Sequence, residues 1–151
     1  MTESIKVVIE GVKITKLKQL VDERGKIMHM IRNDSPIFDK FGEIYFSFTN
    51  PQSIKAWHMH KEMTLNYVCI EGKVKFVLYD DREKSKSKGE YENIILSPKK
   101  YFLITIPPNI WNGFKGLAKG ESIIANCLNL PHNEKEMVRL DINEKRFSYN
   151  W

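Results

Sequence analysis

Hydrophobic and polar positions alternate along this chain in short runs, which is typical of β-strands. Glu43–Thr49 (EIYFSFT) and Ile54–His60 (IKAWHMH) are rich in β-branched and aromatic residues and show this period of two. Runs of this kind recur roughly every 8–12 residues and are separated by turn residues. The pattern therefore predicts an all-β domain, either a barrel or a sandwich.

The remaining elements follow from the same pattern. Further strands are expected at Leu65–Ile70, Lys73–Tyr79, Glu92–Leu96, Tyr101–Ile106, Ser122–Leu128 and Lys26–Arg32, and as a pair in Val7–Leu20 that is broken at Gly11. Turns or loops are expected at Asp22–Gly25 (DERG), Asn33–Pro36, Glu71–Gly72 and Asp80–Gly89. Only Pro131–Val138 is predicted as a short helix, and Arg139–Trp151 is expected to form an extended tail.

Two stretches organise the chain. Lys55–Gly72 carries His58 and His60, and the period of two places both imidazoles on one face of a strand. Ile104–Leu117 (ITIPPNIWNGFKGL) has a Pro-Pro turn and a WNGF segment between strand-like runs. These stretches predict a small β-barrel with polar groups in its mouth.

Composition limits the class of protein. The 151 residues are 42% hydrophobic and 28% charged, which fits one globular domain over residues 1–151 and argues against disorder. No apolar run approaches the roughly 18 residues of a membrane span. The N-terminus (MTESIKVVIEGVKI) has acidic residues inside its apolar part and no cleavage site of small residues. We therefore expect a cytoplasmic protein.

Charge and cysteine content narrow the possible partners. The net charge of +5 is modest, and the lysines of Lys84–Lys88 and Lys99–Lys100 suit a solvated surface or an anionic small molecule such as a nucleotide diphosphate. A dense basic stripe with interleaved aromatic residues is missing, so nucleic acid is not an expected partner. Cys69 and Cys127 lie within strand-like runs and are predicted to be buried free thiols.

His58 and His60 allow three interpretations. A metal site would need further ligands, but the downstream position holds Thr64-Leu65 and the second stretch offers Asn112 where a histidine would be expected. Both histidines could instead serve only the core. We favour a third interpretation, a metal-free site in which at least one imidazole is a base or contacts substrate.

A neutral imidazole, with an ordinary pKa of about 6.5, suits removal of a proton next to a carbonyl group. The enolate oxygen that develops must be stabilised by hydrogen-bond donors. Candidate donors on the predicted strands are Lys55, Lys61, Asn66 and Asn112. Trp57 and Trp111 either wall the cavity and stack on a sugar or base, or belong to the ordinary core.

Charged residues elsewhere have two interpretations each. Arg24, in the DERG turn, either clamps a phosphate or is a surface arginine. Asp80, Asp81 and Arg82 either orient a histidine or form an ion pair inside a solvated loop. For Arg139 and Asp141 we prefer a structural salt bridge.

Several segments carry a family resemblance. They are Asp22–Gly25, Gly42–Phe46, Lys55–Lys61 (KAWHMHK), Gly72–Lys88, Ile106–Phe114 (IPPNIWNGF) and Tyr149–Trp151. In this order and spacing the chain resembles the dTDP-4-dehydrorhamnose 3,5-epimerase family of cupins, and in particular its shorter members. The resemblance implies an all-β double-stranded β-helix, or cupin jelly roll, with short N-terminal strands and an extended C-terminal tail.

The resemblance also implies a homodimer, a nucleotide-linked 4-keto-6-deoxy sugar as substrate, and no metal or organic cofactor. A base would remove the proton beside the ketone, and a proton would return on the opposite face of the sugar. His58 falls on the catalytic base of the family and Arg24 on an arginine that contacts phosphate. Lys55 replaces a substrate-contacting arginine, His60 stands where the family has Gln, and Asn112 stands where it has a His near the diphosphate.

The chain departs from the family pattern at several positions. The tyrosine that donates the proton aligns with Ala125, and a second tyrosine aligns near Pro131-His132. A lysine beside the enolate aligns with Leu65, and the aspartate partner of the base is expected beyond Trp151. The candidates for a substitute donor are Tyr67, Tyr79, His60 and His132. These departures are compatible with epimerisation at a single carbon or with loss of activity.

Lys55–Gly72 is also similar to the sugar-nucleotide 3,4-ketoisomerase cupins, which share the HxHK pattern. We predict an epimerase of a nucleoside-diphosphate 4-keto-6-deoxy sugar in surface glycan synthesis, with His58 as base and His60 as a proton relay or substrate contact. Substrate contacts are expected from Arg24, Lys55, Trp57, Asn66, Trp111 and Asn112. The alternatives are a ketoisomerase, a cupin that binds sugar nucleotides without catalysis, and a metal-dependent cupin enzyme.

Overall fold

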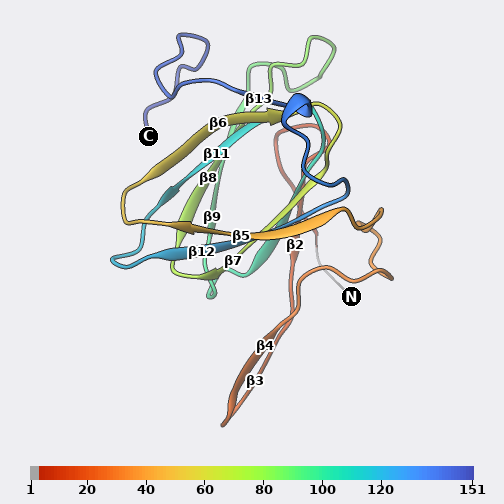
Figure 1. The fold of residues 1–151 in the computed structure, drawn as a ribbon, viewed down its shortest axis with the longest axis vertical. Coiled ribbons are helices and arrows are strands. Elements are labelled where there is room, and N and C mark those ends of the chain that lie inside the picture. Colours follow the sequence, from red (N-terminus) through yellow and green to blue (C-terminus); the bar gives the residue numbers. More distant parts are fainter. Residues whose placement is uncertain (1–3) are drawn as a thin grey trace.

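Two antiparallel sheets lie face to face in the computed structural model, which describes residues 4–151 (Figure 1). One sheet has the order β1-β2-β10-β7-β12-β5 and the other the order β13-β6-β11-β8-β9. The six-stranded sheet contains β1 (Ser4–Ile5), β2 (Lys13–Lys16), β5 (Glu43–Thr49), β7 (Leu65–Glu71), β10 (Phe102–Ile106) and β12 (Ser122–Leu128). The five-stranded sheet contains β6 (Ile54–His60), β8 (Val74–Tyr79), β9 (Tyr91–Leu96), β11 (Trp111–Gly116) and β13 (Met137–Arg139).

The core fills the space between the two sheets, because alternate side chains of each strand point inward. Its buried members include Leu65, Tyr67, Phe76, Leu78, Leu96, Ile104, Ile106, Phe114 and Ile124. Each such side chain contributes about 1.5–3 kcal/mol through removal from water. The arrangement confirms the predicted all-β class and its sandwich-like form.

Most predicted strands agree with the structure, and four regions differ. Trp111–Gly116, expected only as a segment between strands, is itself strand β11. Val7–Leu20 holds no strand before Gly11; β2 covers only Lys13–Lys16. The strand predicted over Lys26–Arg32 is β4 (Gly25–Met28), which ends four residues earlier.

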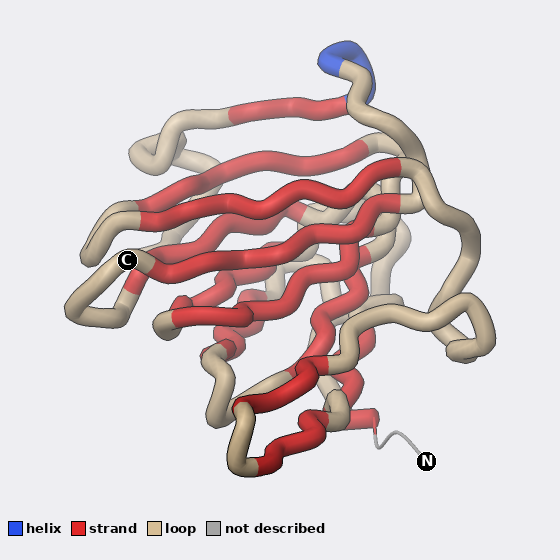
Figure 2. Tube along the Cα trace, turned by 60° about the horizontal axis from the view of Figure 1, so that its bottom comes forward, coloured by secondary structure: helices blue, strands red, loops and turns tan. Residues whose placement is uncertain are grey.

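The fourth difference concerns the predicted helix at Pro131–Val138. It contains one 3-10 turn, η1 (Glu134–Glu136), followed directly by strand β13 (Figure 2). Asn133 caps the turn by accepting a hydrogen bond from the backbone N–H of Lys135. The helix does not continue because Met137–Arg139 pairs with His58–His60 of β6. Long-range strand pairing therefore overrides the local helix propensity. Among the described residues, no helix is long and apolar enough to cross a membrane.

The C-terminal tail covers the outer face of the five-stranded sheet. Leu140 exchanges two backbone hydrogen bonds with Trp57, each 3.0 Å long, and Phe147 stacks on the Trp57 ring at 4.4 Å. Tyr149 and Trp151 add edge contacts to the same indole. The tail is therefore extended, as predicted, and its aromatic residues fix the strand that carries both histidines.

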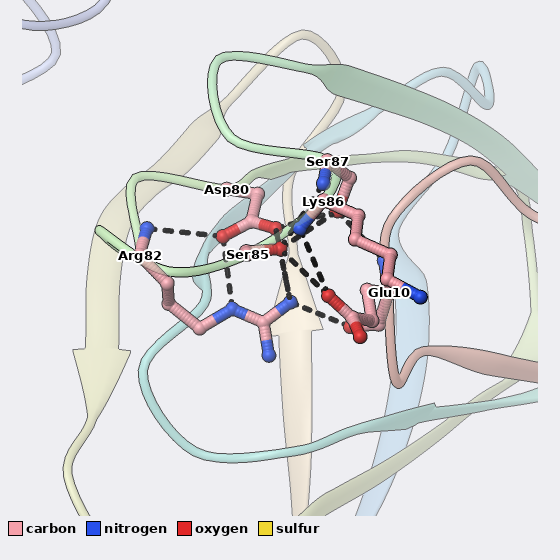
Figure 3. Close-up of polar contacts among 6 residues, drawn as sticks. All are labelled: Glu10, Asp80, Arg82, Ser85, Lys86 and Ser87. Carbon is pink, nitrogen blue, oxygen red and sulfur yellow. Dashed lines mark hydrogen bonds and ion pairs between the residues drawn. The ribbon is translucent and has the colours of Figure 1, made fainter.

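The lysine-rich loop between β8 and β9 is anchored by a buried carboxylate (Figure 3). Asp80 is fully buried and accepts hydrogen bonds from Arg82, Ser85 and Ser87. Arg82 also donates to the Glu10 carbonyl at 2.6 Å, which ties the loop to the N-terminal segment. Of the two interpretations of this motif, the internal ion pair is correct, because the described partners of the Asp80 carboxylate are Arg82, Ser85 and Ser87 and include no histidine.

One hairpin stands apart from the two sheets. Among the described strands, β3 (Gln19–Asp22) and β4 (Gly25–Met28) pair only with each other, and they project away from the sandwich (Figure 1). The predicted DERG turn joins them, and Gly25 adopts φ +139°, a conformation that favours glycine. Leu20, Val21 and Ile27 on this hairpin are exposed.

Candidate active site

A cavity of about 530 Å³ opens between the edge strand β5 of one sheet and strands β6 and β13 of the other. That volume suits a small ligand of several ring systems. The residues that line it are Glu43, Tyr45, Ser47, Ile54, Lys55, Ala56, Trp57, His58, His60, Met63, Tyr67, Phe114, Leu128, His132, Met137, Arg139 and Leu140.

Strand β6 supplies both histidines to one wall of this cavity. His58 and His60 lie on the same face, as the period of two predicts, and their ring centroids are 6.3 Å apart. A bulge between β6 and β11 shifts the register from Asn112–His58 to Phe114–Lys55. The bulge therefore brings Lys55 to the cavity along with the histidines, although strict alternation would separate them.

His60 is paired with a carboxylate from the turn before β13. Its Nδ1 contacts Oε1 of Glu136, and both side chains are buried, at 7% and 5% exposure. The other carboxylate oxygen of Glu136 accepts hydrogen bonds from the backbone N–H groups of Glu62 (3.1 Å) and Met63 (3.2 Å). Although burial raises the pKa of Glu136, the hydrogen bonds from His60 and these amides outweigh it and lower that pKa.

His58 is in a different electrostatic setting. Burial, then the neighbouring His60, then the charge of Arg139 lower the pKa of His58 to about 4, and Asn112 acts weakly in the opposite direction. His58 is therefore neutral at physiological pH. Asn112 is itself fully buried and donates to the backbone carbonyl of His58 at 3.3 Å, so it supports the strand.

Two cationic side chains, Arg139 and Lys55, and the imidazole of His132 lie around the cavity. Arg139 lies on β13 and is exposed, and His132 comes from the loop before the turn. Lys55 donates to Ser47 Oγ and to the Phe48 carbonyl oxygen, both at 2.7 Å, so it bridges to the edge strand β5. Burial lowers the pKa of Lys55, partly offset by Glu121. This concentration of positive charge suits an anionic group such as a phosphate.

The facing wall, from the six-stranded sheet, presents two phenols. Tyr45 and Tyr67 line the cavity from β5 and β7, opposite the histidine strand. The Asn126 amide donates to the Tyr45 hydroxyl at 3.0 Å. Burial, and then the adjacent Tyr45, raise the pKa of Tyr67 well above its usual value.

The position that the resemblance aligns with the proton-donating tyrosine, Ala125, does not face the cavity. Ala125 packs with Val68, Tyr101 and Leu103 on the outer face of the sheet, so its side chain does not face the cavity. The neighbouring Asn126 faces inward and contacts Tyr45. Because successive residues of a strand point to opposite faces, the cavity-facing position of this part of β12 is Asn126 and not Ala125.

Four of the predicted substrate contacts, Arg24, Asn66, Trp111 and Asn112, do not line the cavity. Arg24 is exposed at the turn of the projecting hairpin and pairs with Asp22 at 2.7 Å. Asn66 is buried in hydrogen bonds with Thr105 and with the Cys127 carbonyl. Trp111 packs edge-on against Phe147 with a centroid distance of 5.3 Å.

The other predictions have mixed outcomes. Lys55, His58 and His60 line the cavity, and Trp57 lines it while belonging mainly to the aromatic cluster under the tail. Asn112 does not line the cavity, and it acts on the site through its hydrogen bond to the backbone carbonyl of His58. Among the described ion pairs, none joins Arg139 to Asp141, so the expected salt bridge is wrong. Cys69 and Cys127 are free and buried, as predicted.

Two further observations bear on the choice of chemistry. Among residues 4–151, no three His, Cys, Asp or Glu side chains come together as a metal ion would require. Of the candidate donors named from the sequence, Tyr79 stacks on Tyr91 at 4.4 Å in the aromatic cluster and is absent from the cavity lining.

The sequence did not reveal Glu136, Arg139 or Tyr45 as site residues. Glu136 lies 76 positions from His60, and β13 has only three residues, too few to show a period. The alternation of residue types in Glu43–Thr49 is clear and places Tyr45 on the same face as Ser47, but it does not show which face meets the cavity. Which face of β5 meets the cavity depends on the pairing of the two sheets.

Comparison with known proteins adds three findings. The family model described as FdtA: WxcM-like, C-terminal matches residues 10–144. The probable low-salt glycan biosynthesis epimerase Agl13 of Haloferax volcanii is 31% identical over 144 residues, covering 94% of this chain and 89% of the relative. The dTDP sugar isomerase of Desulfovibrio desulfuricans G20 has a TM-score of 0.95 at 38% identity, covering 97% of this chain and 94% of that one.

A more distant structure bears on the fold. The dTDP-4-dehydrorhamnose 3,5-epimerase of Bacillus anthracis str. Ames, determined with TDP and PPi bound, has a TM-score of 0.89 at 17% identity and covers 100% of this chain and 90% of that chain. It confirms the cupin jelly roll that the resemblance implied. The chain belongs to the FdtA (WxcM-like, C-terminal) family, with relatives that include a probable glycan-biosynthesis epimerase and a dTDP-sugar isomerase.

Proposed function

We propose that the protein is an epimerase that inverts C3, C5 or both of a nucleoside-diphosphate-linked 4-keto-6-deoxy sugar in glycan synthesis. The single observation that carries this proposal is the placement of imidazoles and phenols on facing walls of one cavity. Epimerisation removes a proton from one face of a ring carbon and returns a proton to the other face, so it needs proton-transfer groups on both sides. His58 and His60 stand on one side, and Tyr45 and Tyr67 on the other.

The reaction balances without a co-reactant. A base on the histidine wall takes the proton of the carbon beside the ketone, and the electron pair of that C–H bond forms the enolate. A phenol on the facing wall then returns a proton to the same carbon, and the enolate collapses to the ketone. Tyr45 is the better donor, because it is more exposed than Tyr67, whose raised pKa makes it a weaker acid.

The rim of the cavity suits the diphosphate. Arg139 and Lys55 supply positive charge there and would bind phosphate oxygens by charge-assisted hydrogen bonds, and His132 supplies a further ring nitrogen. Trp57 exposes too little of its ring for extensive stacking on a sugar. These side chains replace the earlier assignment of Asn112 and Asn66 to direct substrate contact.

Arg24 would serve this reaction only in an assembly. It lies on the projecting hairpin and does not line the cavity of its own chain. We therefore retain it as a phosphate contact only within the proposed homodimer, where the hairpin would reach the cavity of the second copy. A light-scattering mass equal to that of one chain under assay conditions would contradict this assignment.

A second candidate is a 3,4-ketoisomerase acting on the same kind of sugar. It is favoured by the two imidazoles, whose ring centroids lie 6.3 Å apart on one face, because such a pair could move a proton between adjacent carbons on one side of the ring. The Desulfovibrio relative, described as a dTDP sugar isomerase, is compatible with either reaction.

One experiment separates these functions. Candidate 4-keto-6-deoxy sugar nucleotides are incubated with the protein in deuterium oxide and followed by NMR. An epimerase places deuterium at C3 or C5 and keeps the ketone at C4, whereas a ketoisomerase moves the ketone to C3. Binding without label would instead indicate a non-catalytic sugar-nucleotide protein and would contradict the proposal.

A further inference from the structure

We propose that His60 is the base of the reaction and that Glu136 is the positioning residue that keeps its Nε2 free of a proton. This inference rests on the proposed function and deepens it. It differs from the roles expected from the sequence, in which His58 is the base and His60 a proton relay or substrate contact. Glu136 had no role in that expectation.

The contact between the two side chains fixes the tautomer of His60. An ionised carboxylate only accepts hydrogen bonds, so Nδ1 of His60 must carry the proton that it shares with Glu136. The lone pair of the neutral ring is then on Nε2. This ring lines the cavity, and Nε2 makes no hydrogen bond within the described part of the chain. His60 therefore presents an unprotonated nitrogen to a bound substrate.

Glu136 is held in this position by more than one contact. Its second oxygen accepts from two consecutive backbone amides, those of Glu62 and Met63. Its own carbonyl oxygen accepts from the backbone N–H of Lys61 at 2.9 Å. A carboxylate fixed in this way stabilises the imidazolium that forms when His60 takes a proton, and it needs no rearrangement to do so.

His58 has the complementary chemistry. It has no carboxylate partner in the described chain, and the positive charge of Arg139 faces it across the strand pair. A neutral imidazole can donate one hydrogen bond, so His58 is suited to stabilise the enolate oxygen. In the reaction, the substrate proton moves to Nε2 of His60, the C–H electrons form the enolate, and His58 donates to its oxygen.

The substitution Glu136→Gln makes the inference testable. The carbonyl oxygen of the new side chain can replace the carboxylate oxygen that accepts from Glu62 and Met63, but its amide group then donates to Nδ1 of His60. The imidazole must respond by moving its proton to Nε2, which blocks the base. Glu136→Gln thus changes the tautomer while conserving shape, and Glu136→Asp retains the charge.

The first measurement needs no substrate. In protein labelled with ¹⁵N-histidine, NMR is expected to show His60 protonated at Nδ1 in the wild type and at Nε2 in Glu136→Gln. Glu144→Gln, an equal change in the exposed tail, is expected to leave the wild-type tautomer. A wild-type His60 protonated at Nε2 would overturn the inference even if the variant failed to fold.

The second measurement follows deuterium exchange into a turned-over sugar nucleotide. Glu136→Gln is expected to lower kcat by about 100-fold with KM within about twofold, and Glu136→Asp to recover part of the loss. Deuterium exchange by Glu136→Gln at the wild-type rate would contradict the role of Glu136, and so would a rise in KM with kcat unchanged. Wild-type protein that labels no sugar contradicts the proposed function, whereas the NMR spectrum still decides the pairing of Glu136 with His60.

Discussion

Arg139 lies opposite His58 in the antiparallel pairing of β13 with β6, so a permanent positive charge faces an imidazole at the cavity wall. The guanidinium disfavours protonation of His58, in addition to burial and His60. Its exposed position also makes it available to a phosphate of the substrate. One residue of a three-residue strand therefore influences both the protonation state of the site and its attraction for anions.

Replacement of Arg139 should separate these two effects. Arg139→Gln is expected to raise the pKa of His58 from about 4, although burial and His60 should keep it below its ordinary value of about 6.5. Binding of a nucleoside diphosphate should weaken about 10-fold. NMR titration of His58 and calorimetry measure these quantities. Arg32→Gln, which removes only an exposed ion pair with Asp34, is the control. An unchanged His58 titration would show that Arg139 does not act on it.

Acid should destabilise the fold through His58 before it affects the carboxylates. The folded pKa of His58 is lowered to about 4, so the unfolded chain, with an ordinary pKa of about 6.5, binds the proton first as the pH falls. Stability is therefore fully present above about pH 6.5 and decreases down to about pH 4, by at most about 3 kcal/mol. Urea unfolding of the wild type and His58→Asn at pH 7 and 5 measures this slope. An equal slope in both proteins would contradict the prediction.

The buried carboxylate of Asp80 should control the stability of the loop between β8 and β9. Asp80→Asn removes the negative charge that pairs with Arg82. It also removes one of the two carboxylate oxygens that accept hydrogen bonds from Arg82, Ser85 and Ser87. We expect a loss of about 3 kcal/mol of unfolding free energy at pH 7. Glu83→Gln, which alters the exposed pair with Lys88 in the same loop, should have no measurable effect.

The pH dependence provides a second check on Asp80. Its hydrogen bonds, outweighing burial, lower the pKa of Asp80, so the stabilisation is present above the unfolded pKa of about 4 and is lost as the pH falls below it. The difference in unfolding free energy between the wild type and Asp80→Asn should therefore become smaller as the pH is lowered. A difference that stays constant from pH 7 to pH 3 would mean that the charge is not responsible.

Long, regular strands were predictable from the sequence because their pattern is local. Glu43–Thr49, Ile54–His60 and Ser122–Leu128 have the boundaries that alternation and turn residues indicate. The two histidines share a face for the same reason. The aromatic tail was expected to be extended, but its contacts with Trp57 depend on the fold of the whole sheet.

The site residues that the sequence did not predict are those brought together by long-range strand pairing. Glu136 meets His60 only because β13 adds to the edge of the five-stranded sheet, and no local pattern specifies that register. Tyr45 takes the place beside Asn126 because β5 pairs with β12. The outward orientation of Ala125 has the same origin, since the pairing of β12 with β5 and β7 decides which of its faces meets the cavity.

Gly113 is predicted to be essential for the geometry of the histidine wall. A Cβ at this position would collide with the side chain of Ala56 and lie 2.9 Å from the Lys55 carbonyl oxygen, at the bulge that brings Lys55 to the cavity. Gly113→Ala should destabilise the protein by about 1–3 kcal/mol, because the packed strands must separate. Gly120→Ala is the matched control, since no atom of residues 4–151 outside its chain neighbours lies within 4 Å of the added Cβ. Thermal unfolding measures stability, and nucleotide binding reports the position of Lys55. If Gly113→Ala matched Gly120→Ala in both measurements, the close approach of β6 and β11 would not be what shapes the cavity.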